Sequence, residues 1–187
     1  MIDKTNPSKE VEKYISDSIT SGVPKNEIYS QVKSKYPAYD DDSVAKKIAS
    51  YIKEDVKKRN VIYTYILAIF VIISLVFSFI TPSFYSSQAM QIYDWSWRII
   101  VGIIAIFFII GFLQFKLFYY TTAVSLYSLY LVLLLYNFFV YPISLLLIIS
   151  SVGTVVTFVY LYLLRKRIFP NISLWGTVIK ENGIYKF

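Results

Sequence analysis

Four long runs of apolar residues, almost free of charge, constrain this chain more than any other feature. A helix needs about 20 mainly apolar residues to cross the hydrocarbon core of a bilayer, and in lipid it satisfies its own backbone hydrogen bonds. We therefore predict an all-α, polytopic bundle of four transmembrane helices within residues 59–165. The predicted helices cover residues 61–81, 97–115, 118–139 and 143–164.

Polar or helix-breaking residues separate the four runs. Pro82 ends the first run, and the mainly polar or aromatic residues 83–95 predict a loop before the second. Lys116 marks a tight turn between the second and third runs. Residues 140–142, which include a proline, predict a short link to the fourth run.

Lysine and arginine residues flank the runs unevenly, and loops rich in them stay in the cytoplasm. If the chain crosses four times, Arg98 alone lies on one side. The other side carries Lys57, Lys58, Arg59, Lys116, Arg165, Lys166 and Arg167. That side is predicted to be cytoplasmic, so both termini lie in the cytoplasm. Nothing before residue 60 is apolar enough for a signal peptide, so we expect the first span to insert as an uncleaved anchor.

Aromatic side chains gather near the ends of the runs, as they do at the two interfaces of a membrane. The belt on the cytoplasmic side is predicted to contain Tyr63, Tyr65, Tyr119, Tyr120, Tyr160 and Tyr162. The opposite belt is predicted to contain Tyr93, Trp95, Trp97, Phe138, Phe139 and Tyr141.

Residues 1–58 differ in composition from the rest of the chain. Ten of the 12 acidic residues lie before residue 60, and apolar residues recur there at helical spacing. Gly22 and Pro24 separate a first helix from a second, and Pro37 follows the second. A third helix is predicted from Asp42 to the end of this segment, and the alternative is that it continues into the first apolar run. The pattern indicates a soluble cytoplasmic domain of three short helices, similar in outline to UBA-like or helix-turn-helix modules.

This helical domain is expected to bind a protein partner, because modules of such an outline usually do. The alternative is that it only caps the membrane part. The first 59 residues carry twelve basic and ten acidic residues, a net charge of +2, with the acids interleaved throughout. Attraction to phosphate is then weak, and no nucleic-acid partner is expected.

The residue types present argue against catalysis. The chain contains neither cysteine nor histidine, and only Asp94 and Glu181 supply acids beyond residue 60. Thiolate and imidazole chemistry are therefore excluded, and an acid or metal mechanism within the membrane lacks the side chains it needs. We expect a protein that is not an enzyme and that holds no cofactor and no metal.

Polar but uncharged side chains cluster on the third and fourth runs at similar depth, given the rise of about 1.5 Å per helical residue. Small and hydroxyl side chains allow membrane helices to approach closely, so we favour helix packing as their role. The alternative is the lining of a small polar channel, which needs several copies of the chain. This polar seam comprises Ser125, Tyr127, Ser128, Tyr130, Ser150, Ser151, Thr154 and Thr157.

Residues 166–187 are predicted to form a cytoplasmic tail with a hairpin. Asn182-Gly183 stands between two short runs of β-favouring residues, which is a strong signal for a two-residue hairpin. An isolated hairpin is only marginally stable. The hairpin is therefore expected to rest on the inner face of the membrane bundle or on the N-terminal domain.

The layout resembles a group of small, uncharacterised membrane proteins common in Bacteroidota. The shared features are a short helical N-terminal segment, four spans, a basic stretch with a proline at Arg165–Pro170, and a closing Asn-Gly-x-Tyr-x-Phe at Asn182–Phe187. The resemblance implies residence in the bacterial cytoplasmic (inner) membrane and implies no known activity.

Together these features predict a multi-pass, non-enzymatic accessory or assembly protein. Its surroundings are the lipid bilayer, and a protein partner docks through residues 1–58. The alternative is a component of a small oligomeric channel or transporter, built as a homo-oligomer, in which Tyr127, Tyr130 and Thr154 face water.

Overall fold

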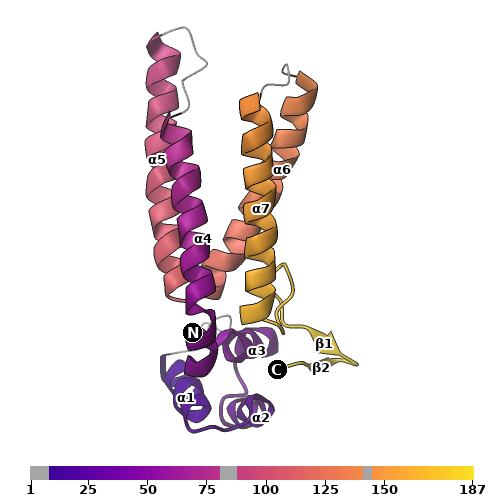
Figure 1. The fold of residues 1–187 in the computed structure, drawn as a ribbon. Coiled ribbons are helices and arrows are strands. Elements are labelled where there is room, and N and C mark those ends of the chain that lie inside the picture. The colour runs from indigo at the N-terminus through magenta and orange to yellow at the C-terminus, as the bar shows by residue number, and fades with distance from the viewer. Residues whose placement is uncertain (1–8, 81–87, 141–144) are drawn as a thin grey trace. The chain divides into compact units, whose positions relative to one another are not determined.

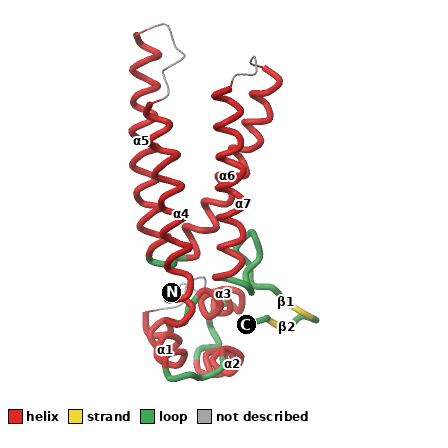
Figure 2. Tube along the Cα trace, in the orientation of Figure 1, coloured by secondary structure: helices red, strands yellow, loops and turns green. Residues whose placement is uncertain are grey.

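The computed structural model describes residues 9–80, 88–140 and 145–187. These residues form seven helices and one two-stranded sheet (Figure 1), and Figure 2 shows their loops and turns in green. A mainly helical chain with a short hairpin near residue 187 is therefore confirmed. The elements are α1 (Lys9–Thr20), α2 (Lys25–Lys35), α3 (Asp41–Ser50), α4 (Glu54–Ile80), α5 (Gln88–Leu113), α6 (Leu117–Val140), α7 (Leu145–Ile168), β1 (Lys180–Glu181) and β2 (Ile184–Tyr185).

The chain divides into two compact units. One consists of Met1–Arg59 together with Arg165–Phe187, and the other of Asn60–Leu164. We call them the polar unit and the apolar unit. α4 and α7 each continue from one unit into the other as a single helix. Of the two places expected for the hairpin, the chain thus uses the N-terminal domain.

Three helices pack around one apolar core in the polar unit. The core residues recur at intervals of three or four along each helix, which places them on one face. They are Val11, Ile15 and Ile19 of α1, Ile28 and Val32 of α2, and Val44 and Ile48 of α3. Each fully buried side chain of this kind contributes roughly 1.5–3 kcal/mol, so this face holds the three helices together.

α1 ends as the sequence predicts. Gly22 has a φ of 85°, in the left-handed region that glycine adopts without strain. Its N–H donates to Ile19 O at 3.1 Å, and Val23 N donates to Ser18 O at 3.1 Å, the pattern of a glycine-capped helix. Pro24 is the N-cap of α2.

The third helix is shorter than predicted. α3 ends at Ser50, Tyr51 is extended with φ −72° and ψ 125°, and α4 begins as a new helix at Glu54. Glu54 and Asp55 favour a helix start there, because the helix dipole stabilises negative charge at an N-terminus. Asp55 also pairs with Arg59 one turn later, at 2.8 Å. The residues that lead into the first apolar run therefore belong to α4.

Among the described residues, two helical segments are long and apolar enough to cross a membrane, judged by length and composition. They are Glu54–Val76 and Asp94–Leu113, and a shorter apolar helix covers Leu117–Val132. As complete elements, α6 and α7 are 24 residues long each. The bundle of four spans stays a prediction.

α5 begins earlier than predicted, at Gln88, so the second half of the expected loop is helical. Asp94 and Arg98 form an ion pair at 2.9 Å one turn apart, and the Arg98 guanidinium lies 5.4 Å from the Trp95 ring centroid. Such contacts between neighbouring turns stabilise a helix. Residues 81–87, which include the first half of the expected loop, lie outside the described residues, as do residues 141–144 of the predicted link and fourth span.

The turn between α5 and α6 is as tight as predicted. α5 ends at Leu113 and α6 begins at Leu117. Phe115 adopts a left-handed conformation with a φ of 54°, and Lys116 N donates to Gly111 O at 3.1 Å. The chain reverses direction within three residues.

A buried tyrosine joins three helices of the apolar unit. The Tyr120 hydroxyl donates to Phe112 O of α5 at 3.1 Å and lies 3.3 Å from Thr64 Oγ1 of α4. Tyr120 is fully buried, so it does not lie on the surface as the predicted interfacial belt requires. The short turn before α6 is the reason, since it brings the first turns of that helix against α5. Tyr160 links α7 to α4 in a similar way, donating to Tyr63 O at 2.9 Å.

The predicted hairpin is present. Lys180 pairs with Tyr185 and Glu181 with Ile184 in the antiparallel register. Asn182 and Gly183 have φ values of 51° and 80°. A two-residue turn of this kind needs positive φ at both positions, which Asn-Gly supplies at low cost.

Candidate interaction site

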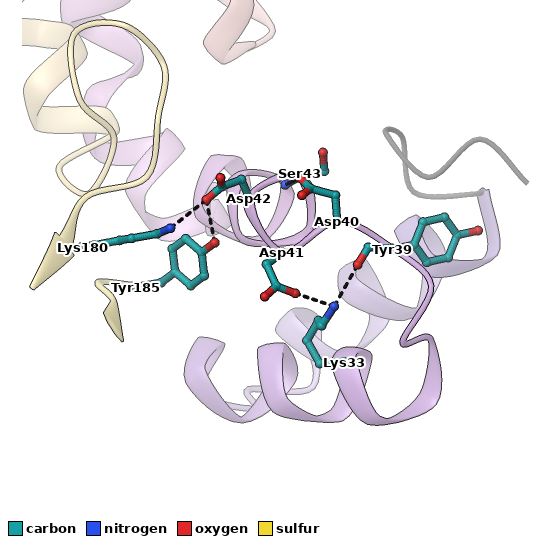
Figure 3. Close-up of polar contacts among 8 residues, drawn as sticks. All are labelled: Lys33, Tyr39, Asp40, Asp41, Asp42, Ser43, Lys180 and Tyr185. Carbon is teal, nitrogen blue, oxygen red and sulfur yellow. Dashed lines mark hydrogen bonds and ion pairs between the residues drawn. The ribbon is translucent and has the colours of Figure 1, made fainter. Parts of the chain in front are cut away.

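Three consecutive acidic residues mark the start of α3. Asp40 is the N-cap, and its carboxylate accepts a hydrogen bond from Ser43 N at 2.8 Å, which satisfies one N–H of the first turn. Asp41 pairs with Lys33 of α2, whose Nζ also donates to Tyr39 O at 2.8 Å (Figure 3). Asp40 therefore caps α3, and Asp41 joins α3 to α2.

The third acid, Asp42, receives the C-terminal hairpin. Its Oδ1 accepts a hydrogen bond from the Tyr185 hydroxyl at 2.6 Å and lies 3.1 Å from Lys180 Nζ (Figure 3). Both partners come from the paired strands β1 and β2, and the Lys180 ammonium lies 4.5 Å from the Tyr185 ring centroid. One carboxylate thus binds the two strands together and to α3.

Aromatic packing reinforces this contact. Tyr185 and Phe187 share one side of the extended chain, because alternate residues of a strand point the same way. The Tyr29 ring of α2 lies 5.2 Å from the Tyr185 ring and 5.7 Å from the Phe187 ring, centroid to centroid. Pairs of this kind contribute about 0.5–1.5 kcal/mol beyond their burial. Phe187 also packs against the apolar core of the three helices.

The hydrogen bonds of the site shift the ionisation of its members. The bonds from Tyr185 and Lys180 hold the pKa of Asp42 below its ordinary value, because both stabilise the carboxylate. Burial and the hydrogen bond to that carboxylate raise the pKa of Tyr185, and burial and the nearby Asp41 raise the pKa of Tyr29. At neutral pH the tail is therefore bound by an ionised Asp42 and a protonated phenol.

The segment between α7 and the hairpin forms a compact loop. The buried Arg165 donates to Ser173 O, Ser173 N donates to Thr177 O at 2.7 Å, and Ile179 N donates to Asn171 O at 3.0 Å.

The other basic residues predicted to set the topology lie near the surface. Lys57 is 3.4 Å from Glu54 and Arg59 is 2.8 Å from Asp55, whereas Lys58, Lys116, Lys166 and Arg167 are exposed.

Three hydroxyl groups of the polar seam bond within their own helices. Ser125 Oγ donates to Thr121 O at 3.1 Å, Ser128 Oγ to Val124 O at 2.8 Å and Thr157 Oγ1 to Gly153 O at 2.8 Å. Thr157 is buried, Tyr127, Ser128, Ser151 and Thr154 are half-buried, and Ser125 and Tyr130 are exposed. The side chain of Ser150 lies outside the described residues.

Sequence reasoning located the hairpin but missed the residues that receive it, Tyr29 and Asp42. The alternation of aromatic residues at 185 and 187 was the available signal, because it predicts one aromatic face on the tail. Asp42 lies 143 positions before Tyr185 in the sequence. No local sequence pattern connects residues that are so far apart.

Within the described part of the chain, no cluster of three or more acidic side chains is arranged to hold a metal ion. Comparison of the chain with protein-family models, with curated proteins and with solved structures gives no match.

Proposed function

We propose that this chain is a non-enzymatic, four-span protein of the bacterial cytoplasmic membrane that presents a cytoplasmic helical domain to a protein partner. The observation that carries the proposal is the docking of the tail on Asp42 and Tyr29, which makes the two ends of the chain parts of one folded domain. A multi-pass anchor that returns both ends to one domain is suited to holding that domain at the membrane.

Joining of the two ends favours an even number of crossings. α4 leaves the polar unit at residue 60 and α7 re-enters it at residue 165. Because a folded domain cannot lie on both sides of a bilayer, the chain between these points must return to the side from which it started. Two or four spans satisfy this condition, whereas three do not.

Helix length and charge favour four spans over two. α6 is 24 residues long without a charged residue, and α7 carries its only charges at Arg165, Lys166 and Arg167. A 24-residue helix is about 36 Å long at 1.5 Å per residue, which exceeds the hydrocarbon core of about 30 Å. Exposing both helices to water would leave large apolar surfaces uncovered.

Single-cysteine labelling tests the topology, because the chain has no native cysteine. Ser34→Cys in α2, Gln114→Cys in the α5–α6 turn and Asn182→Cys in the hairpin are expected to react with a membrane-impermeant maleimide only after spheroplasts are permeabilised. Ser86→Cys, in the predicted outer loop, is expected to react in intact spheroplasts. Reaction of Ser34→Cys and Asn182→Cys from opposite sides would overturn the proposal.

Site-specific cross-linking tests the partner. Lys9, Lys13 and Asp17 lie on one exposed face of α1, at intervals of four residues. A photo-reactive group at Lys13→Cys is expected to capture one protein in cells, whereas the same group at Gln114→Cys serves as the control for proximity at the membrane. Cross-links to further copies of this chain alone, with Tyr127→Cys, Tyr130→Cys and Thr154→Cys all accessible to water-soluble thiol reagents, would favour the channel instead.

A further inference from the structure

A cavity of about 440 Å³ opens in the polar unit beside the start of α2. Its walls come from the start of α2, the link between α3 and α4, the first turn of α4 and the chain around the end of α7. The polar side chains that line it are Lys25, Asn26, Tyr51, Lys53, Arg167 and Asn171. Three of these carry positive charge, and no side chain among the described lining residues is acidic.

The structure fixes the position of one of these cations. Lys25 Nζ donates to Tyr51 O at 3.0 Å, in the link that follows α3, and to Ala49 O at 3.4 Å, in the last turn of α3. An ammonium group has three N–H donors, and two of them are directed to these carbonyl oxygens. The backbone therefore holds the ammonium at the cavity wall without neutralising its charge.

Electrostatics favour an anion at this position. Burial and the repulsion from Lys53 lower the pKa of Lys25 from 10.5 to about 8, so the folded chain holds this charge at a cost. Arg167 adds a third positive charge to the lining. A guanidinium group binds phosphate oxygens in a bidentate manner, and a lysine ammonium binds them as a point charge. A doubly or singly charged phosphate in the cavity would offset the repulsion between Lys25 and Lys53.

The place of the cavity in the chain supplies a second argument. Val56 of α4 and Ile168 of α7 also line it. Each lies within about two helical turns of an apolar run, which begins at Val61 in α4 and ends at Leu164 in α7. If these runs cross the membrane as proposed, the cavity belongs to the chain segments nearest the bilayer surface, where lipid phosphates are abundant.

From this geometry we propose that the cavity is a binding site for a phosphate group, held by Lys25, Lys53 and Arg167. The group comes either from the head of an anionic phospholipid or from a soluble phosphate ester. This site goes beyond the partner-binding role proposed above and does not depend on it, since a soluble phosphate can enter the cavity whether or not the chain binds a protein.

The test uses the full chain purified in a non-ionic detergent and delipidated. Native mass spectrometry and thermal unfolding measure binding of dioleoyl phosphatidylglycerol, inorganic phosphate and glycerol 3-phosphate, with dioleoylglycerol as the lipid that lacks phosphate and sodium chloride as the salt control. Saturable binding of one phosphate-bearing probe per chain, with no such binding of dioleoylglycerol, is the expected result. Binding of phosphatidylglycerol alone identifies a lipid headgroup as the source of the phosphate. Competition by glycerol 3-phosphate or inorganic phosphate identifies a soluble source.

A matched pair of variants tests the residues. Lys25→Gln/Lys53→Gln/Arg167→Gln is expected to weaken binding at least about tenfold, because several charged hydrogen bonds are lost. Lys13→Gln/Lys46→Gln/Lys166→Gln removes the same charge from exposed positions outside the lining and is expected to bind as the natural chain does. Lys25→Arg, which keeps the charge, separates loss of binding from loss of folding and is expected to retain affinity. Equal affinities of the two triple variants, or failure of every phosphate-bearing probe to bind, would overturn the site.

Discussion

At the scale of single residues, Tyr120 contributes to the packing of three helices in the apolar unit. Tyr120 is fully buried, and its hydroxyl contacts α5 through Phe112 O and α4 through Thr64. Tyr120→Phe removes the donor but keeps the ring, so the free energy of unfolding is expected to fall by about 1 kcal/mol. Thermal unfolding in detergent measures this change. Tyr130→Phe, at an exposed position of the same helix, is the control, and an equal effect of the two substitutions would contradict the role of Tyr120.

Two helical glycines make a second matched pair. A Cβ at Gly111 would overlap the ring of Tyr119, whereas none of the described residues lies within 4 Å of a Cβ at Gly153. Alanine normally stabilises a helix interior relative to glycine by roughly 0.5–1 kcal/mol. We therefore expect Gly153→Ala to be neutral or stabilising and Gly111→Ala to destabilise by about 1–3 kcal/mol, because the ring must move. A melting temperature of Gly111→Ala above that of the natural chain would show that the α5–α6 packing is looser than described.

Lys25 makes stability depend on pH. Its pKa is lowered from 10.5 to about 8 in the folded state, so between these values the unfolded chain binds more protons. Stability therefore rises with pH over this window, and the cost of the charge is fully present below pH 8. Lys25→Met removes this contribution. Between pH 8 and 10.5 the melting temperature of the natural chain is expected to rise relative to that of the variant. A difference in melting temperature that stays constant over this range would contradict the shifted pKa.

At the scale of elements, the hairpin and α3 depend on each other. Asp42→Asn keeps the side-chain shape but removes the charge that Lys180 and Tyr185 contact. Because the pair is exposed, the expected loss is only about 0.5–1 kcal/mol, enough to increase amide hydrogen exchange in residues 180–187 several-fold. Asp17→Asn, at an exposed position of α1, is the control. Unchanged exchange in the hairpin would show that aromatic packing alone holds it.

Low pH is expected to loosen the hairpin of the natural chain, as Asp42→Asn does. The pKa of Asp42 is lowered in the folded state, so its contribution is fully present above the unfolded pKa of about 4 and is lost as pH falls through the lowered value. Hydrogen exchange of the hairpin should therefore increase, relative to the intrinsic rate, below about pH 4. In Asp42→Asn this acid-dependent increase should be smaller.

At the scale of the whole molecule, the polar unit cannot be completed until residues 185–187 have been synthesised. The tail contacts residues 29 and 42 from more than 140 positions away, and contacts of such separation form late because they close a long loop. Truncation after Ile179 is expected to increase hydrogen exchange in α2 and α3 while leaving α5 unchanged. Exchange that rises equally in both units would contradict the division of the chain into separate units.

The sequence by itself determined the helices, the Asn182-Gly183 hairpin and the tight turn at Lys116, because apolar periodicity, glycine and asparagine conformations and short connections are local properties. Sequence also predicts four spans and their orientation from run length and flanking charge. Tertiary structure alone decided that Tyr120 is buried and that the tail docks on Asp42 and Tyr29. These depend on which surfaces meet after folding, and partners separated by 56 residues for Tyr120 and Thr64, or by 143 for Tyr185 and Asp42, leave no periodic trace in the chain.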